Sequence, residues 1–166
     1  MAERPLTHIE VAEARLVFGA GLNYARVHIV ENTPLPNWIA DLGRSPKPNS
    51  VTLGNLSLFP LALRTLTADI AAGDLNDMGW LIHELAHQWQ FQRLGWSYLP
   101  RAMRVQLREG MKGYRYQLAA DRRLFEFNLE QQGDIARDYY AAFKRGQDVN
   151  LWEPLIAELR AGAYRR

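Results

Sequence analysis

The amino-acid sequence predicts an α+β domain that is mostly helical and holds a short β-sheet. Several segments repeat apolar residues at helical spacing, begin with a capping residue and end at glycine. Two short runs instead alternate apolar and polar residues, as strands do. The 166 residues are the usual length of one domain, so we expect residues 1–166 to form a single domain.

The N-terminal third is predicted to contain one helix and two strands. Thr7 and Glu10 form a capping-box pattern that starts a helix after the polar, helix-like first residues, and Gly19 ends it. The apolar stripe of this helix comprises Ile9, Val11, Ala12, Leu16 and Val17. Residues 26–30 and 50–59 have the strand-like alternation. The stretch between them holds four of the eight prolines and is predicted to be a loop.

The strongest helix prediction covers residues 78–94. Asp74, Asn76 and Asp77 offer N-caps in front of this helix, and Gly95 closes it. The helix carries an apolar stripe of Ile82, Ala86 and Trp89. This stripe is expected to anchor the helix in the hydrophobic core.

The C-terminal third is predicted to hold two more helices. Asn128 and Gln131 form a second capping-box pattern, which predicts a helix to about residue 144. Asn150 and Glu153 repeat the pattern for a last helix. The remaining segments are two short helices and an irregular linker, predicted over residues 61–72, 101–108 and 110–122.

Charge and composition exclude several classes of protein. The net charge is only +2 and the most basic stretch, residues 101–108, is short, so we expect no nucleic-acid partner. The absence of cysteine excludes disulfides and thiolate metal sites. The first ten residues lack the apolar core of a signal peptide, and no run approaches the roughly 18 apolar residues of a membrane span. We therefore expect a cytoplasmic protein, or one exported by a signal-peptide-independent secretion system.

Residues 83–87 read H-E-L-A-H, which is the H-E-x-x-H pattern, inside the strongest predicted helix. Residues four apart share a helix face, so the imidazoles of His83 and His87 can bind one metal ion. Glu84 lies beside them and can accept a proton from water activated by that ion. Such a short pattern can arise by accident, but two of the only four histidines fall in it. We expect Zn²⁺ at this site.

A catalytic zinc site needs a third protein ligand. The other histidines, His8 and His28, lie upstream, and no histidine follows shortly after the motif, so a downstream carboxylate is expected. The candidates are Asp121, Glu126, Glu130, Asp134 and Asp138. Glu130 fits best because it lies in the first turn of the helix capped by Asn128. The alternatives are Glu126 and Asp121.

Two supporting roles are also predicted. Asp134 lies four residues after Glu130, so one of these carboxylates can bind metal while the other orients His83 or His87. A phenol could stabilise the oxyanion of a hydrolytic transition state, and we select Tyr116 for this role. The other tyrosines considered are Tyr114, Tyr139 and Tyr140.

H-E-L-A-H followed by a helix with Glu130 and Asp134 resembles the gluzincin arrangement of zinc peptidases. The chain also resembles Vgr-related bacterial proteins and the metallopeptidase domain associated with extracellular contractile injection systems. The segments that carry this resemblance are RPLTHIEVAEARLVFGAGLNYARVHI, VTLGNLSLF, HELAHQWQ, YRYQL and LEQQGDI. The resemblance implies a zincin-like fold with a small sheet beside the active-site helix. It also implies His83, His87 and Glu130 as zinc ligands and Glu84 as the base.

These observations lead to two main functional expectations. The first is a zinc-dependent metallopeptidase that hydrolyses a peptide or protein substrate, with VTLGNLSLF as a strand that pairs with the extended substrate. The alternative is a non-catalytic, metal-stabilised accessory, effector or cargo domain that binds a secretion-apparatus partner. One departure from the family concerns position 133, where the resemblance implies alanine and this chain has Gly133. Glycine is expected to loosen the helix there.

Overall fold

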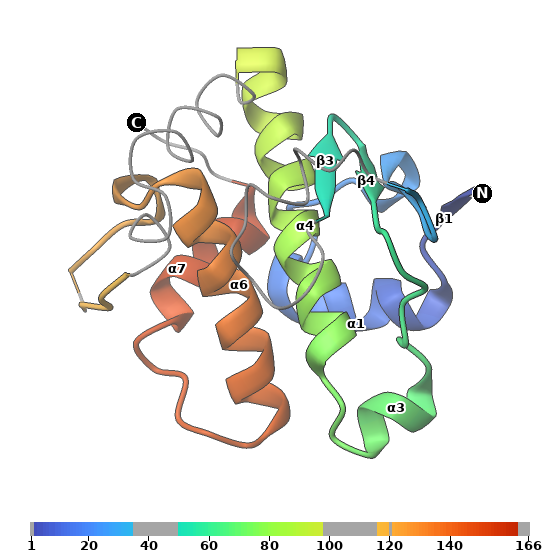
Figure 1. The fold of residues 1–166 in the computed structure, drawn as a ribbon. Coiled ribbons are helices and arrows are strands. Elements are labelled where there is room, and N and C mark those ends of the chain that lie inside the picture. Colours follow the sequence, from blue (N-terminus) through green and yellow to red (C-terminus); the bar gives the residue numbers. More distant parts are fainter. Residues whose placement is uncertain (1, 35–49, 98–115, 120, 163–166) are drawn as a thin grey trace.

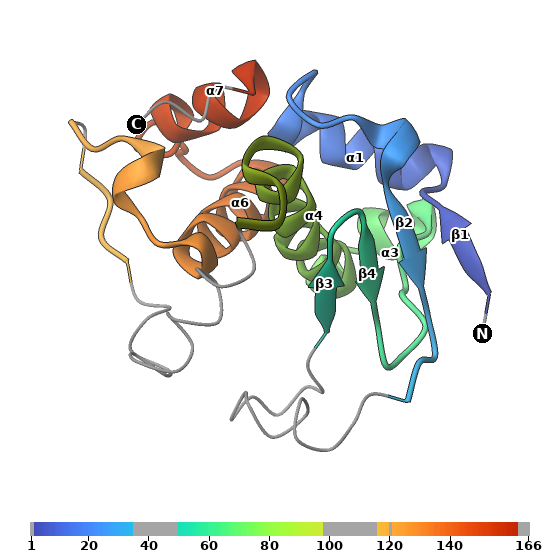
Figure 2. The ribbon, with the colours of Figure 1, turned by 90° about the horizontal axis from the view of Figure 1, so that it is seen from above.

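The computed structural model describes residues 2–34, 50–97, 116–119 and 121–162. Helix α4 (Asn76–Leu94) runs through the centre, between a small sheet on one side and helices α6 (Leu129–Lys144) and α7 (Glu153–Ala161) on the other (Figures 1 and 2). Helix α1 (His8–Phe18) contacts α4, α6 and α7. The predicted α+β class, mostly helical with a short sheet beside the motif helix, is confirmed.

Short elements connect these helices. Helix α3 (Thr67–Ala71) precedes α4. Within the described residues, the 3₁₀ turns are η1 (Tyr24–Arg26), η2 (Gly95–Ser97) and η4 (Leu124–Glu126). The predicted helix over 101–108 and most of the predicted linker over 110–122 lie outside the described residues, as does most of the proline-containing loop.

The sheet has four strands of three residues each in the order β1-β2-β4-β3. These strands are β1 (Glu3–Pro5), β2 (His28–Val30), β3 (Val51–Leu53) and β4 (Leu56–Leu58). Strand β2 pairs in antiparallel fashion with β1 and in parallel with β4, and β3 pairs in antiparallel fashion with β4. Strand β3 is therefore the sheet edge nearest α4 (Figure 2).

Two strand predictions were wrong in detail. The run over 50–59 is a β3–β4 hairpin and not one strand, because Gly54 turns the chain with a φ of 67°, a conformation that glycine adopts without steric cost. The first residues were expected to be helix-like, yet β1 forms there. Its backbone pairs with β2, a contact between residues more than 20 positions apart that local patterning does not reveal.

The helix over 61–72 was also predicted too long, since only Thr67–Ala71 is helical. Side chains from elsewhere bind the amides before it. Glu31 accepts a hydrogen bond from the backbone N–H of Leu63 at 2.7 Å, and Asp77 accepts one from the N–H of Arg64 at 3.0 Å. These tertiary hydrogen bonds replace the helical ones and hold the segment out of a helix.

The predicted helix caps are present at two helices and absent at two others. The capping boxes of α1, at Thr7 and Glu10, and of α6, at Asn128 and Gln131, are both present. By contrast, α4 and α7 begin after Leu75 and Trp152, and neither has a side-chain cap. In α4 the predicted cap Asn76 is itself the first helical residue.

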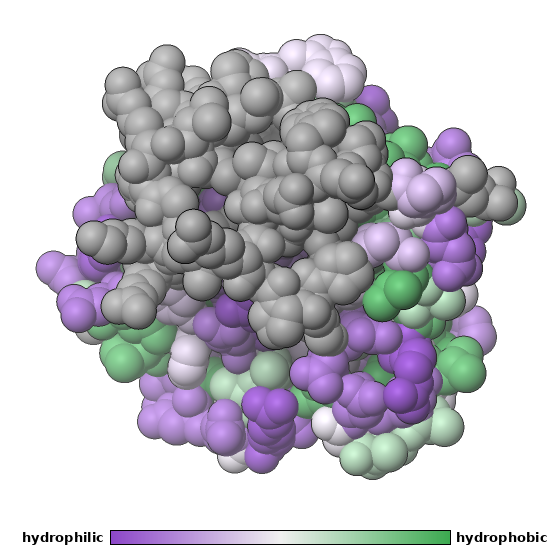
Figure 3. Space-filling view, in the orientation of Figure 1, coloured by the Kyte–Doolittle hydropathy of each residue, from purple (hydrophilic) through white to green (hydrophobic). Residues whose placement is uncertain are grey.

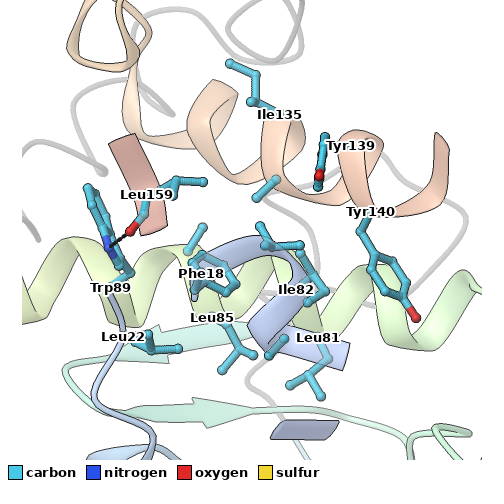
Figure 4. Close-up of a cluster of buried hydrophobic side chains, with 14 of the residues drawn as sticks. Phe18, Leu22, Leu81, Ile82, Leu85, Trp89, Ile135, Tyr139, Tyr140 and Leu159 are labelled. Atoms are coloured by element: carbon cyan, nitrogen blue, oxygen red, sulfur yellow. Dashed lines mark hydrogen bonds between the residues drawn. The ribbon is translucent and has the colours of Figure 1, made fainter. Parts of the chain in front are cut away.

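Hydrophobic side chains gather between α4, α6, α1 and the sheet (Figure 4). On the face of the molecule in Figure 3, hydrophilic residues predominate in the described part. The predicted stripe of Ile82, Ala86 and Trp89 is fully buried. The Trp89 indole N–H donates to the carbonyl of Leu159 at 3.1 Å, which connects α4 to α7 (Figure 4). Burying each large apolar side chain stabilises the fold by about 1.5–3 kcal/mol, so α4 is firmly positioned.

Among the described residues, none of the helices has both the length and the apolar character that crossing a membrane requires.

Candidate metal centre

Helix α4 presents His83 and His87 on one face, one turn apart. Their Nε2 atoms lie 3.2 Å from each other, and their rings meet edge to face at 4.9 Å between centroids. The His87 side chain is buried, and the His83 side chain is nearly so. The two imidazoles therefore direct a nitrogen each to one point beside the helix.

Helix α6 brings Glu130 to the same point. The capping box at Asn128 sets the start of α6, so Glu130 stands in its first turn and faces α4. Its Oε2 lies 3.5 Å from His83 Nε2 and 3.6 Å from His87 Nε2. We call these three residues the ligand triad.

The spacing of the ligand triad fits a zinc ion. Its three donor atoms form a triangle with edges of 3.2, 3.5 and 3.6 Å. Nitrogen and oxygen ligands at about 2.0–2.2 Å from a tetrahedral zinc stand roughly 3.3–3.5 Å apart. Two histidines and one carboxylate are also a donor set of catalytic zinc sites. Both the distances and the chemistry of the triad therefore suit this ion.

Glu84 offers a carboxylate oxygen in the same place, since its ligand atom and those of His83 and His87 lie within 4.8 Å of one another. Both of its oxygens, however, accept hydrogen bonds from the sheet side. Ser50 Oγ donates to Oε1 at 2.6 Å, and Thr52 Oγ1 donates to Oε2 at 2.5 Å. Glu130 is therefore the better candidate for a third ligand, and Glu84 lies beside the triad with both oxygens already hydrogen-bonded.

The direction of the Ser50 bond follows from its neighbour. The indole N–H of Trp80, which can only donate, gives a hydrogen bond of 2.6 Å to Ser50 Oγ. The Ser50 proton is then directed to Glu84. Trp80 and Glu84 lie one turn apart on α4, on the face toward the sheet. The helix thus presents the two histidines to α6 and the carboxylate of Glu84 to β3.

The other carboxylates considered as ligands lie elsewhere. Glu126 accepts a hydrogen bond from the backbone N–H of Arg123 at 2.5 Å and is exposed, and Asp121 is exposed in a turn. Asp138 accepts a hydrogen bond from a tyrosine at 2.7 Å. Of the five predicted candidates, only Glu130 faces both histidine Nε2 atoms.

Asp134 lies beside Nδ1 of His83, the ring nitrogen that does not face Glu130. Its Oδ1 lies 3.1 Å from His83 Nδ1 and 2.5 Å from the Nη1 of Arg137. Neither His83 Nδ1 nor Asp134 Oδ1 has a hydrogen-bond partner within the described part of the chain, so this close approach is a contact between charges. Asp134 therefore lies where its charge can act on His83, and its role in orienting a histidine stays a prediction.

The ionisation of the site is set by its buried carboxylates. Burial of the His83 ring favours its neutral form, but contacts with Asp134 and Glu130 outweigh burial and raise its pKa to about 10. The pKa of His87 is also raised, where burial is opposed chiefly by Glu130. Burial favours the neutral acid of Glu130, but His87 and His83 lower its pKa far below the usual range. The site thus stabilises positive charge among its carboxylates, as a cation-binding site requires.

Gly133 lies against the ring of His83, a contact that the sequence did not indicate. The residue is buried, and a Cβ added to it would lie 2.7 Å from His83 Cε1 and 2.8 Å from Nδ1. A side chain at this position would force α6 or the ring to shift. Glycine here allows α6 to approach α4 closely enough for Glu130 to reach both histidines.

Tyr116 has two polar partners outside the ligand triad. Its hydroxyl donates to Asp138 at 2.7 Å and accepts a hydrogen bond from the Trp152 indole at 3.3 Å. Of the other tyrosines considered, Tyr139 and Tyr140 bond to Glu153 and Glu13 respectively. Tyr114 lies outside the described residues. The role of Tyr116 toward an oxyanion stays a prediction.

Sequence reasoning missed Ser50 and Thr52. The signal that could have indicated them is their spacing of two, which places both hydroxyls on one face of a strand. It also missed Gln90, whose side chain contacts His87. Gln90 follows His87 by three residues, so the two share a helix face.

Comparison with known proteins agrees with this fold. No family model matches the chain. The solved structure of the effector domain of Pseudomonas aeruginosa VgrG2b is similar, with a TM-score of 0.68 and 30% sequence identity over 90% of this chain and 80% of that one. The type VI secretion system spike protein VgrG2b of Pseudomonas aeruginosa is 33% identical over 141 residues. That match covers 84% of this chain but only 13% of the spike protein.

The fold and these likenesses define the class of the protein, a small Vgr-related α+β domain. The chain belongs to the family of the VgrG2b effector domain.

Proposed function

We propose that this chain is a zinc-dependent peptidase in which the ligand triad holds the ion and Glu84 is the general base. The observation that carries the proposal is the triangle of His83, His87 and Glu130 donor atoms, with edges of 3.2–3.6 Å, beside the hydrogen-bonded carboxylate of Glu84. Zinc at such a site supplies a Lewis acid for a peptide carbonyl and makes water a stronger acid.

The residues of the chain have separate tasks in this reaction. Glu84 takes the proton from the attacking water and passes it to the amine that leaves when the peptide bond breaks. Ser50 and Thr52 hold both of its carboxylate oxygens, so the base keeps one orientation. Asp134 keeps His83 directed toward the triad.

Strand β3 gives a place for the substrate. It is one of the two edge strands of the described sheet, the other being β1, and Thr52 on β3 contacts Glu84 directly. An extended peptide can add to a free sheet edge by backbone hydrogen bonds. A peptide bound along β3 would run past the general base, which supports peptide or protein as the substrate class.

Zinc analysis together with the variant Glu84→Gln tests this function. The wild-type chain is expected to bind zinc and to cleave members of a broad peptide library, and Glu84→Gln is expected to keep zinc but lose cleavage. Glu126→Gln, which changes an exposed carboxylate away from the triad, is the matched control and should cleave normally. Equal inactivity of the wild type and Glu84→Gln, both zinc-loaded, would contradict the proposal.

The likeness to the VgrG2b effector domain favours a second proposal, that the chain is an effector or cargo domain associated with a type VI secretion apparatus. Its export would then need no signal peptide. In a purely non-catalytic form of this role, metal would only stabilise the fold. Recovery of the native protein with a secretion spike, and a phenotype that Glu84→Gln leaves unchanged, would favour that form over the peptidase.

A further inference from the structure

Two glutamines are fully buried next to the ligand triad. Gln90 lies on α4 and Gln132 on α6, and neither side chain is accessible to solvent. Burying an amide is costly unless its N–H and C=O groups are hydrogen-bonded. The partners of these two amides therefore determine which way each one is oriented.

Backbone carbonyls orient Gln132. Its Nε2 donates to the carbonyl oxygens of Phe127 at 2.9 Å and Leu124 at 3.1 Å. A carbonyl oxygen can only accept, so the NH₂ group of Gln132 must face these two atoms. Its Oε1 then points the other way, toward Gln90.

Gln90 is oriented in the same manner. Its Nε2 donates to the carbonyl of Leu129 at 2.8 Å and to Oε1 of Gln132 at 3.0 Å, which uses both of its hydrogens. Its Oε1 is left facing His87 Nδ1 at 2.9 Å. Because an amide oxygen only accepts, His87 Nδ1 must carry a hydrogen. The lone pair of the neutral ring is then on Nε2, the nitrogen that faces His83 and Glu130.

We propose that Gln90 and Gln132 are positioning residues that fix His87 in its Nδ1–H form and connect it to the turn of α6 that carries Glu130. This inference rests on the metal site proposed above. The partners Leu129 and Gln132 flank Glu130 in sequence, so the hydrogen bonds run from one ligand on α4 to the backbone beside the other ligand on α6. We call these hydrogen bonds of Gln90 and Gln132 the relay. The relay sets the tautomer of His87 and the position of its ring relative to Glu130.

The relay differs from the support of the other histidine. His83 faces the carboxylate of Asp134, whereas His87 faces a neutral amide. A neutral acceptor orients the ring without adding another negative charge to a site that already holds Glu84, Glu130 and Asp134.

Nitrogen NMR of the His87 ring in the wild-type chain tests the tautomer directly. Nδ1 is expected to carry a hydrogen in both the metal-free and the zinc-loaded protein. An Nδ1 without hydrogen in either state would overturn the inference, and this measurement needs no variant.

Zinc affinity, measured by competition with a chelator, tests the positioning role. Methionine has nearly the shape of glutamine without its amide, so Gln90→Met is expected to weaken zinc binding by about 10- to 100-fold, as loss of an outer-shell partner does. Gln92→Met is the matched control. Gln92 is also on α4, but its amide bonds to Asn23 and Asn55, so zinc affinity should stay at the wild-type value.

The variant Gln132→Met tests whether the two amides act as a unit. The side chain of Gln132 bonds to Gln90 and to two backbone carbonyls, yet its loss is expected to weaken zinc binding. The double variant should bind zinc no more weakly than Gln90→Met alone. If Gln90→Met bound zinc as tightly as the wild type, the inference about the glutamines would be overturned and the proposed metal site would stand. A wild-type chain that binds no zinc would instead contradict the proposed function.

Discussion

Gly133 lies against the imidazole of His83 so closely that a Cβ on this residue would stand 2.7 Å from the ring. The contact explains why α6, a helix with an otherwise helix-favouring sequence, has glycine in its second turn. Glycine at position 133 lowers the helix propensity of α6, but it lets α6 and α4 approach closely enough to form one site.

Gly133→Ala is expected to destabilise the protein by about 1–3 kcal/mol, as overpacking of a close contact does, and to weaken zinc binding because α6 must move away from His83. Urea unfolding and chelator competition measure the two effects. Gly79→Ala is the matched control. This glycine is also inside a helix, but its added Cβ would meet only the half-exposed side chain of Arg137 at 3.3 Å, so the substitution should be neutral or stabilise by up to about 1 kcal/mol. Equal effects of both variants would argue against the close contact.

Glu130→Gln is expected to weaken zinc binding by at least the roughly 100-fold that loss of an outer-shell partner can cost, because it removes a charged ligand. The zinc content of the protein after gel filtration in dilute chelator measures this loss of affinity. Glu126→Gln should retain zinc, since that carboxylate caps η4 away from the triad. If Glu126→Gln lost zinc and Glu130→Gln retained it, Glu126 would be the third ligand instead of Glu130.

The metal-free chain is expected to be most stable between about pH 4.5 and 6.5. The pKa of His83 rises on folding from 6.5 to about 10, so its stabilising contribution is complete below pH 6.5 and is lost as the pH rises toward 10. The pKa of Glu130 falls from 4.5, so its contribution is complete above pH 4.5 and is lost in acid. Urea unfolding in excess chelator measures the profile. A free energy of unfolding that increases from pH 6.5 to 10 would contradict these assignments.

Zinc binding is expected to tighten as the pH rises from 6.5 toward 10. A histidine must be deprotonated at the nitrogen that binds the ion, and the pKa of His83 near 10 means that protons compete with zinc across this range. Titration calorimetry in buffers of different ionisation enthalpy should show proton release on binding. Binding at pH 7 with no proton release would contradict the protonated state of His83.

The double variant Ser50→Ala, Thr52→Val is expected to keep zinc but to lose part of the ~10²–10⁴-fold that a positioned general base contributes to the rate. Both hydroxyls that hold Glu84 are removed, so the carboxylate can rotate away from the water. The ratio kcat/KM on a cleaved peptide measures the effect. Thr65→Val serves as control, because it removes a buried hydroxyl bonded to Glu10 and not to Glu84, and it should change stability but not the rate.

The parts of the site that sequence could predict are those encoded by short-range patterns. Positions four apart on a helix place His83 and His87 on one face, and the capping box at Asn128 predicts the helix turn on which Glu130 stands. Both helices form as predicted. The facing of Glu130 toward α4 agrees with its choice among five carboxylates, although its role as a ligand stays a proposal.

The contacts that sequence could not predict join distant segments. Ser50 and Thr52 meet Glu84 across more than 30 residues, and Gln90 meets Gln132 across 42. No periodicity relates such positions, so only the packed structure identifies them. The same reason applies to Gly133, since its closeness to His83 depends on how α6 docks against α4.

The ligand triad spans two helices, and the 42 residues 88–129 lie between His87 and Glu130 along the chain. A metal ion held there would act as a reversible cross-link in a protein that has no cysteine, closing a long loop in the way a disulfide does elsewhere. Unlike a disulfide, this link would persist in a reducing environment and would open when metal is withdrawn. The resistance of the domain to forced unfolding would then depend on how much free zinc surrounds it.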